Sequence, residues 1–434
     1  MFNNILRFAQ EKTKIIYENS LFLQNIDKLI FISILMVFFA STVMSSDVIG
    51  FIALITVLLS FVKILTKPDE KIECKLFELF LLAYFMIVIV SLAGSTLFHL
   101  SLKGFFKTFI YLAFYVSVAQ YLKNNKDKIV YILGAIGLCV SFEAVTGLMQ
   151  NFAKVSEIST WQDVSNLNPE EVMTRVYGTL KPLNPNLLGG YFVAGIPVLY
   201  GLTGYFLSEK KYKFSIIALC LALLSTLVLF LTGCRGSYIG MFVIMCGVFG
   251  VAAKFLWKNY KNIFLSVIGA AVAFLTSAIL FVSSLRARVF SIFAMRQDSS
   301  NSFRFNVYHS SIDMFKDNWL LGIGIGNQNF REIYGLYMKT GFDALSAYNI
   351  FLEIAVESGI FALIAFLGFL LVLIKDGITY ILKSTDTKTV IILSCSLISI
   401  FAVCVHGLVD TVFFRPQIQF VFWTMVAIFR ALRY

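Results

Sequence analysis

The stretch from Ile350 to Ile374, IFLEIAVESGIFALIAFLGFLLVLI, decides the class of this protein. Its length and apolar composition are typical of a helix that crosses a bilayer, which needs about 20 mostly apolar residues. Two carboxylates, Glu353 and Glu357, interrupt it one helical turn apart. Because a charged side chain is costly inside lipid, both are expected to face the interior of a helical bundle.

The composition of the whole chain indicates the same class. Of its 434 residues, 59% are hydrophobic and 14% are charged, and the mean hydropathy is +0.82. Soluble domains are far less apolar. Lipid offers no hydrogen bonds to free backbone groups, so membrane spans must be helices or closed barrels, and the apolar runs lack the alternating pattern of a barrel. We expect an all-α polytopic membrane protein.

Repeated apolar runs with short polar joints predict a single bundle of about 12 transmembrane helices. The predicted spans lie near 27–45, 49–66, 76–98, 104–122, 129–152, 186–207, 214–233, 236–257, 262–284, 350–374, 388–408 and 411–430. Residues 27–430 would then form one transmembrane domain. The preceding segment, 1–26, lacks a small-residue cleavage site and is expected to be an interfacial amphipathic helix. Its apolar face would hold Ile5, Leu6, Phe8, Ile15 and Ile16.

Basic residues indicate the orientation, because Lys and Arg of short loops accumulate on the cytoplasmic side. Lysines occur in every joint assigned to one side, whereas arginine dominates on the other. The lysine joints are 63–75, 123–128, 210–213, 254–261 and 375–388. We therefore expect both termini in the cytoplasm. The formal net charge of +11 is spread over these joints beside lipid headgroups, so it does not indicate nucleic-acid binding.

Cysteine and histidine give no sign of a metal site. The seven cysteines lie mostly in apolar spans without Cys-x-x-Cys spacing, and the chain has three histidines. We expect the cysteines to be packing residues, with neither a disulfide framework nor a zinc site.

Two long external loops, near 153–185 and 285–349, break the pattern of tight joints, and long loops in compact chains are usually functional. In the second loop, a helical period over 303–315 predicts a short amphipathic helix that presents Arg304 toward the bundle. Its apolar face is expected against the membrane surface, with Phe303, Val307, Ile312 and Phe315.

Polar groups gather where some spans meet these loops. In NPNLLGGYF, Asn184 and Pro185 oppose an earlier helix start, so Asn186 is expected to cap the span, and the paired glycines permit close packing. In TGCRGSYIG, Arg235 must either reach the lipid headgroups or pair with an anion. Its planar guanidinium suits the oxygens of a phosphate. GIGIGN, residues 322–327, is expected to be a loop turn, with amides that face an anion as the alternative.

Together with FRFNVYHSSIDMFKDNWLLGIGIGNQNF and AYNIFLEIAVESGI, these motifs resemble the O-antigen ligase and polymerase superfamily of bacterial membrane glycosyltransferases. The group is Wzy_C-like and related to the O-antigen ligase WaaL. The resemblance covers residues 160–425 and is nearest to the IctB-like branch, a group once labelled bicarbonate transporters. It implies a GT-C-like fold in the bacterial inner membrane, with a large periplasmic loop between spans 9 and 10.

The activity that this resemblance implies belongs to polysaccharide or lipopolysaccharide biosynthesis. A glycan would pass from undecaprenyl diphosphate to a lipid or saccharide acceptor at the periplasmic face, without metal, nucleotide or other cofactor. The arginines that bind the diphosphate in the family match Arg235 and Arg304, and Arg175 is a third candidate. The other candidate substrate-binding residues are Asn186, Asn349 and His309.

Tyr348 departs from the family, which has a His-Asn pair where this chain has Tyr348 and Asn349, followed after nine residues by Gly359. A phenol with a pKa of about 10 accepts a proton less readily than an imidazole. Tyr348 would be a base only if arginines stabilised its phenolate, and would otherwise position a sugar. The other candidate bases are Glu353, Glu357, His309 and a pair formed by His406 and Asp410.

Catalytic roles are therefore predicted for Tyr348, Glu353 and Glu357. The two carboxylates repel each other unless arginines of the external loop pair with them or one is protonated. Two alternatives stay open. One is an IctB-like transporter of bicarbonate or another small anion that uses the same arginines, since twelve spans also suit secondary transporters. The other is a catalytically inactive relative that serves as an assembly partner.

Overall fold

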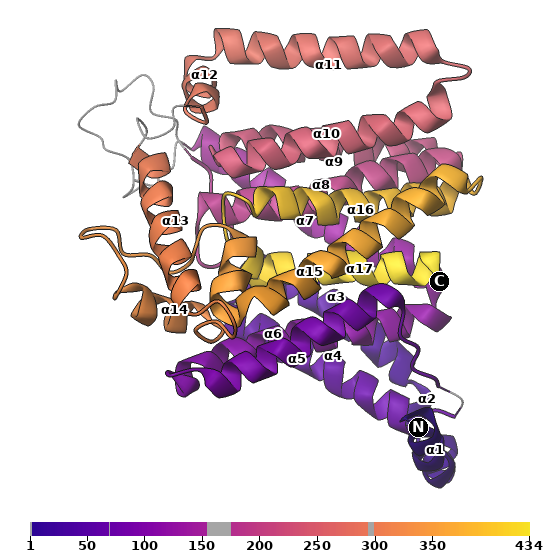
Figure 1. Ribbon diagram of the computed structural model, residues 1–434. Helices are drawn as coiled ribbons and strands as arrows, with labels where there is room; N and C mark the ends of the chain where they lie inside the picture. The colour runs from indigo at the N-terminus through magenta and orange to yellow at the C-terminus, as the bar shows by residue number, and fades with distance from the viewer. Residues whose placement is uncertain (1, 69, 154–174, 294–298) are drawn as a thin grey trace.

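The computed structural model describes residues 2–68, 70–153, 175–293 and 299–434, and within them every regular element is a helix (Figure 1). Eleven of the described helices are long and apolar enough to cross a membrane, so this is a multi-pass membrane protein. They are α3 (Ile26–Val43), α4 (Ser46–Thr66), α5 (Leu76–Gly94), α6 (Phe98–Asn124), α7 (Ile129–Phe152), α8 (Pro185–Ser208), α9 (Tyr212–Leu231), α10 (Arg235–Leu256), α11 (Lys261–Phe281), α15 (Ile350–Lys383) and α16 (Thr387–His406). The remaining elements are α1 (Phe2–Asn19), α2 (Leu21–Gln24), η1 (Lys126–Lys128), α12 (Ser283–Phe290), α13 (Ser299–Asp317), α14 (Asn327–Tyr334), η5 (Val412–Phe414) and α17 (Pro416–Arg433).

The twelfth predicted span, 411–430, corresponds to α17, which is less apolar than the eleven helices above. Its helix, α17, packs against α6, α16, α3 and α8, and nearly all of its residues are buried. Inside this protein environment it carries Gln417 and Thr424, and Arg430 pairs with Glu78 of α5 at 2.8 Å. Polar groups are tolerated there because neighbouring helices, rather than lipid, surround them. The helix therefore lacks the apolar composition of a span, and eleven helices rather than twelve have it.

Both termini lie at one end of the bundle, opposite α13 and α14 (Figure 1). Near the end that holds the termini, Lys63 is buried and pairs with Asp27 at 2.8 Å. The amphipathic helix predicted for the N-terminal segment corresponds to α1, in which Gln10 donates to the carbonyl oxygens of Ile64 and Glu70. These contacts attach α1 to the end of α4.

Helix α11 differs from the other spans because it is scarcely covered by protein. Figure 1 shows it along the edge of the bundle beyond α10, and Phe264 is its one buried residue. Apolar side chains such as Phe274 and Phe281 are exposed on it. A helix that is apolar all round and uncovered suits contact with lipid.

Helix α15 is broken at Gly359, where φ is 80° and ψ is 178°. The amide of Ile360, next to the break, donates to the carbonyl oxygen of Trp319 at 2.8 Å instead of to its own helix. Non-helical backbone at this depth requires such partners, because lipid supplies none. Glu353 and Glu357 therefore lie on a short initial segment of α15, whereas the sequence predicted one continuous span.

The glycine-rich turn 322–327 packs against that short segment. The amides of Ile323 and Gly324 donate to the carbonyl oxygens of Val356 and Glu357, both at 2.9 Å. The amide of Gly326 donates to the carboxylate of Glu357 at 2.8 Å. The turn thus does have an amide that faces an anion, and the anion is a side chain of the protein itself.

The helix predicted over 303–315 is present within α13, but its apolar side has a different neighbour. Val307 is fully buried in a cluster with Met314, Phe330 and Tyr334, which belong to the external segments themselves. Ile312 is exposed. The second long loop therefore has a small core of its own, and burial of Val307 in it replaces the predicted contact with the membrane surface.

Replacement of Gly359 by Ala is expected to destabilise the protein by more than the roughly 1–3 kcal/mol of a non-glycine residue in a left-handed conformation. The added Cβ would also collide with the carbonyl group of Leu320. Gly341→Ala is the matched control, because Gly341 has a φ of 87° but open space around its Cβ position. Thermal unfolding in detergent should show a larger loss for Gly359→Ala. Equal losses would mean that the packing at the break contributes nothing.

Candidate functional site

The candidate site is built around the turn between α9 and α10, residues Thr232 to Arg235. Gly233 there has a φ of 62°, a conformation that favours glycine. Arg235 is the first residue of α10, and its side chain is buried, with Nη1 donating to the carbonyl and hydroxyl oxygens of Ser291 at 3.2 Å. Because the turn is short and α10 begins at Arg235, the position of this guanidinium is closely defined.

Two further arginines hold the backbone of this turn. Nε of Arg175 donates to the carbonyl oxygen of Thr232 at 2.8 Å, and Nε of Arg288 donates to that of Gly233 at 2.8 Å. Arg175 also donates to Oδ1 of Asn186 at 2.6 Å. No role was predicted for Arg288 from the sequence.

Arg175 is positioned by a polar segment that lies beside α7. Thr179 donates to the carboxylate of Glu143 from its amide at 2.9 Å and from its hydroxyl at 2.5 Å. Gln150 accepts from the amides of Tyr177 and Gly178 at 3.0 and 2.9 Å. The carboxylate of Glu143, within α7, is thus satisfied by this segment. Residues 154–174 of the predicted first external loop lie outside the described residues.

Arg304 comes to the same place from α13. One of its nitrogens lies 3.8 Å from a carboxylate oxygen of Asp410, and its guanidinium carbon lies 5.8 Å from the centre of the Tyr348 ring. Asn301, Phe305 and Tyr308 share this face of α13, since helical residues three and four apart are neighbours.

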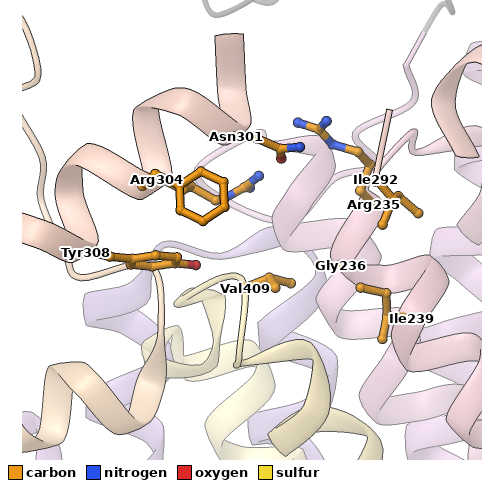
Figure 2. A pocket seen from close by; sticks show the side chains of 9 residues that line it. Arg235, Gly236, Ile239, Ile292, Asn301, Arg304, Tyr308 and Val409 are labelled. Atoms are coloured by element: carbon orange, nitrogen blue, oxygen red, sulfur yellow. The ribbon is translucent and has the colours of Figure 1, made fainter. Parts of the chain in front are cut away.

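Arg235 and Arg304 line one cavity of about 160 Å³ (Figure 2). The other lining residues are Gly236, Ile239, Ile292, Asn301, Phe305, Tyr308 and Val409. Figure 2 shows both guanidinium groups directed toward the side of the cavity where Asn301 lies. Drug-sized ligands usually occupy roughly 300–1,000 Å³, so this cavity suits a compact anionic headgroup better than a whole oligosaccharide.

Next to Gly236 lies a cluster of three buried side chains, in which the predicted pair of His406 and Asp410 is joined by Cys234. Sγ of Cys234 is 3.8 Å from Nε2 of His406. Asp410 completes the cluster, and one donor atom from each residue lies within 4.8 Å of the others. Burial raises the pKa of the Cys234 thiol, but the hydrogen bond and positive charge of His406 outweigh burial and lower that pKa to about 7.

The position of the His406 ring is fixed by the close approach of α8 and α10. A Cβ on Gly236 would lie 2.9 Å from Nε2 of His406, and a Cβ on Gly190 would lie 3.1 Å from Cε1. The close packing predicted for the two glycines of NPNLLGGYF is therefore present. The predicted cap is not, because α8 begins at Pro185 and Asn184 is its N-cap, accepting from the amide of Asn186 at 2.7 Å. Proline suits the first position of a helix, which needs no amide donor.

Tyr348 lies between the external segments and the bundle, with a φ of 51°. Its ring meets that of Phe303 edge-on at 5.6 Å, and its carbonyl oxygen accepts from the hydroxyl of Tyr308 at 3.2 Å. Burial, aided by the negative charge of Asp410, raises the pKa of Tyr348 to about 12, despite the opposing effect of Arg304. Its phenol is therefore protonated throughout the physiological pH range.

Glu353 and Glu357 are both buried, 3% and 4% exposed, as expected of a face turned into the bundle. Their partners are backbone amides rather than arginines. Glu353 accepts from the amide of Ala347 at 3.2 Å, and Glu357 accepts from Gly326. The ion pairs between described residues include neither carboxylate, which contradicts the expected pairing with arginines of the external loop. Neither residue lines the cavity.

Two of the other predicted site residues have different surroundings. Asn349 caps α15, accepting from the amides of Phe351 and Leu352, and its own amide donates to the carbonyl oxygen of Leu408. His309 is exposed on α13, away from the face that lines the cavity. Any contact of these side chains with a substrate stays a prediction. Tyr308, next to His309, is the cavity residue that the helical period could have indicated.

Comparison with known families links part of the chain to a described domain. Residues 220–367 match the family model of the Wzy_C domain, described as O-antigen ligase. The matched region contains Arg235, Arg304 and Tyr348, but ends before His406 and Asp410. No curated protein matches the chain in a sequence search.

Proposed function

We propose that this protein is a membrane glycosyltransferase of the O-antigen ligase or polymerase type. It would transfer a glycan from undecaprenyl diphosphate to a lipid or saccharide acceptor at the periplasmic face of the bacterial inner membrane, with both termini cytoplasmic. The observation that carries the proposal is the single cavity lined by Arg235 and Arg304 within the region that matches the O-antigen ligase domain.

The two arginines would bind the diphosphate of the donor. A guanidinium presents several N–H donors that match phosphate oxygens, and its charge persists at all physiological pH values. In the transfer step, an acceptor hydroxyl oxygen forms a bond to the anomeric carbon while the bond from that carbon to the diphosphate breaks. The electron pair leaves with undecaprenyl diphosphate. Arg235 and Arg304 stabilise this growing negative charge, the kind of preorganised electrostatic help that supplies much of enzyme catalysis.

The acceptor proton needs a base, and His406 with Asp410 is the pair that we propose for it. Nε2 of His406 lies directly against Gly236, which lines the cavity, and Asp410 pairs with Arg304. Tyr348 would position the substrate, because its protonated phenol has no capacity to accept a proton at neutral pH. Glu353 and Glu357 would hold the external turn against α15.

The lipid part of the donor would lie along the exposed side of the bundle near α10 and α11. The uncovered apolar surface of α11 supports this placement, as does Ile239, which extends the lining of the cavity along α10. Such an arrangement leaves the diphosphate at the arginines and the polyprenyl chain in lipid.

Alanine in place of Arg235 or Arg304 is expected to lower the rate of glycan transfer at least about 100-fold, in line with the loss of a transition-state donor. The measurement is release of undecaprenyl diphosphate from a fluorescent lipid-linked oligosaccharide by the protein in nanodiscs. Arg331→Ala is the control, because Arg331 belongs to the same external region but pairs with Asp343 at 2.6 Å and is half exposed. Parental rates in both cavity variants would overturn the proposal.

Tyr348→Phe should keep the transfer rate within about 10-fold of the parent and leave its pH profile unchanged, since general-base catalysis accounts for about 10²–10⁴-fold. His406→Gln should lose about 100-fold or more on the same ground. The comparison uses the same release assay between pH 6 and 9, a range that lies well below the pKa of about 12 of Tyr348. A larger loss of transfer rate in Tyr348→Phe than in His406→Gln would instead identify Tyr348 as the base.

Transport of bicarbonate or another small anion is the second candidate function. The observation that favours it is the break of α15 at Gly359, because broken helices are common at the binding sites of transporters. Proteoliposomes loaded with buffer should show no uptake of labelled bicarbonate beyond that of empty liposomes if the glycosyltransferase proposal is right. Uptake that Arg235→Ala abolishes would instead support the transporter.

A further inference from the structure

We propose that Cys234, His406 and Asp410 form a binding site for a soft divalent metal ion such as Zn²⁺, and that metal bound there inhibits glycan transfer. Only its second part, the inhibition of glycan transfer, rests on the proposed function. The spacing of cysteine and histidine along the sequence gives no sign of this cluster, because Cys234 and His406 are 172 residues apart.

The three donors come from three separate segments. Cys234 is the residue before α10, His406 is the last residue of α16, and Asp410 lies in the connection from α16 to η5. All three side chains are buried, His406 being 3% exposed. Convergence of a thiol, an imidazole and a carboxylate in a buried place is unusual without a role, because isolated polar groups there are costly.

The spacing of the donors fits a small tetrahedral ion. Zinc bonds of about 2.3 Å to sulfur and about 2.1 Å to nitrogen at a tetrahedral angle place those two atoms about 3.6 Å apart. The Sγ–Nε2 distance here is 3.8 Å, and all three donor atoms lie within 4.8 Å of one another. Closing the cluster around an ion therefore needs a shift of a few tenths of an ångström in the first distance and of up to about 1.4 Å in the others.

Packing holds the imidazole in the required orientation. Gly236 and Gly190 approach His406 from two helices, and any larger residue at either position would displace its ring. Nε2 consequently stays on the side of the ring that faces Cys234. A preorganised nitrogen ligand loses little freedom when it binds a metal.

Charge and ligand type favour a particular class of ion. A thiolate and a carboxylate together neutralise a divalent cation, and binding would release the thiol proton of Cys234. Thiolate and imidazole select Zn²⁺ or Co²⁺ over Mg²⁺ or Ca²⁺, which prefer oxygen ligands. Arg304 contacts Asp410 at 3.8 Å, so its charge weakens the site and keeps the metal exchangeable rather than permanently bound.

A metal at this site would inhibit the proposed reaction. Nε2 of His406 has one lone pair in the neutral ring, and a metal that takes it leaves none to accept the proton of the acceptor hydroxyl. Inhibition should therefore be reversible by a chelator. Because Cys234 contacts the same Nε2 atom at 3.8 Å, inhibition of each variant is measured relative to its own metal-free rate, which separates metal binding from any effect of the substitution on catalysis.

The test is a titration of the full-length protein in nanodiscs with Co²⁺, followed by absorption spectroscopy. Thiolate-to-cobalt charge transfer should give a near-ultraviolet band that grows to one ion per chain. Cys234→Ser should abolish this band, while Cys220→Ser, which changes an exposed cysteine of α9, should keep it. His406→Gln should raise the Kd at least about 10-fold, since even changes to outer-shell partners cost 10–100-fold.

A wild-type protein without the band, or a band that survives Cys234→Ser, would overturn the metal site and leave a hydrogen-bonded pair of Cys234 and His406. Serine is nearly isosteric with cysteine, so Cys234→Ser should fold as the parent does. An unchanged elution volume and thermal unfolding midpoint would show that loss of the cobalt band in this variant is not caused by misfolding.

The inhibitory part has its own readout. Zn²⁺ should suppress the release of undecaprenyl diphosphate by the parent protein and by Cys220→Ser, but not by Cys234→Ser, and a chelator should restore it. Failure of the metal-free parent to release any product would contradict the proposed function while the cobalt spectrum still decides the metal site. Equal suppression of all three proteins would place the inhibitory metal elsewhere.

Discussion

The left-handed turn at Gly233 is the constraint on which the arrangement of the site depends. It ends α9 and starts α10 within a few residues, so Arg235, Cys234 and the carbonyl groups of the turn have fixed places. Arg175 and Arg288 bind those carbonyl groups and secure the turn to the first external segment and to the region after α11. Positive charge thus accumulates around a few backbone atoms, and the cavity opens beside them.

Two buried carboxylates of the bundle obtain their hydrogen bonds from backbone amides. Glu143 and Glu357, each within a transmembrane helix, accept from backbone amides of non-helical segments that lie against their helices. A carboxylate bound to amides offsets part of its desolvation cost and satisfies backbone that lipid would leave without partners. Glu143 and Glu357 therefore attach these non-helical segments to the bundle, while Arg235 and Arg304 line the cavity.

Hydropathy was sufficient to predict eleven spans, because lipid-facing helices must be apolar. The twelfth predicted span, 411–430, contains α17, which is less apolar because its surroundings are protein. The break at Gly359 was missed because its hydrogen-bond partner, Trp319, belongs to another segment. Motifs singled out Arg235 and Arg304, and both line the cavity. Of the cluster of Cys234, His406 and Asp410, the sequence pairs the last two, whereas only folding brings Cys234 to them from 172 residues away.

A structure of the protein with undecaprenyl diphosphate bound in nanodiscs tests the central claim most directly. The phosphorus atoms are expected between the guanidinium groups of Arg235 and Arg304, with the lipid chain leaving along α10. A headgroup bound at any place out of reach of both arginines would contradict the claim, whatever the activity of the protein.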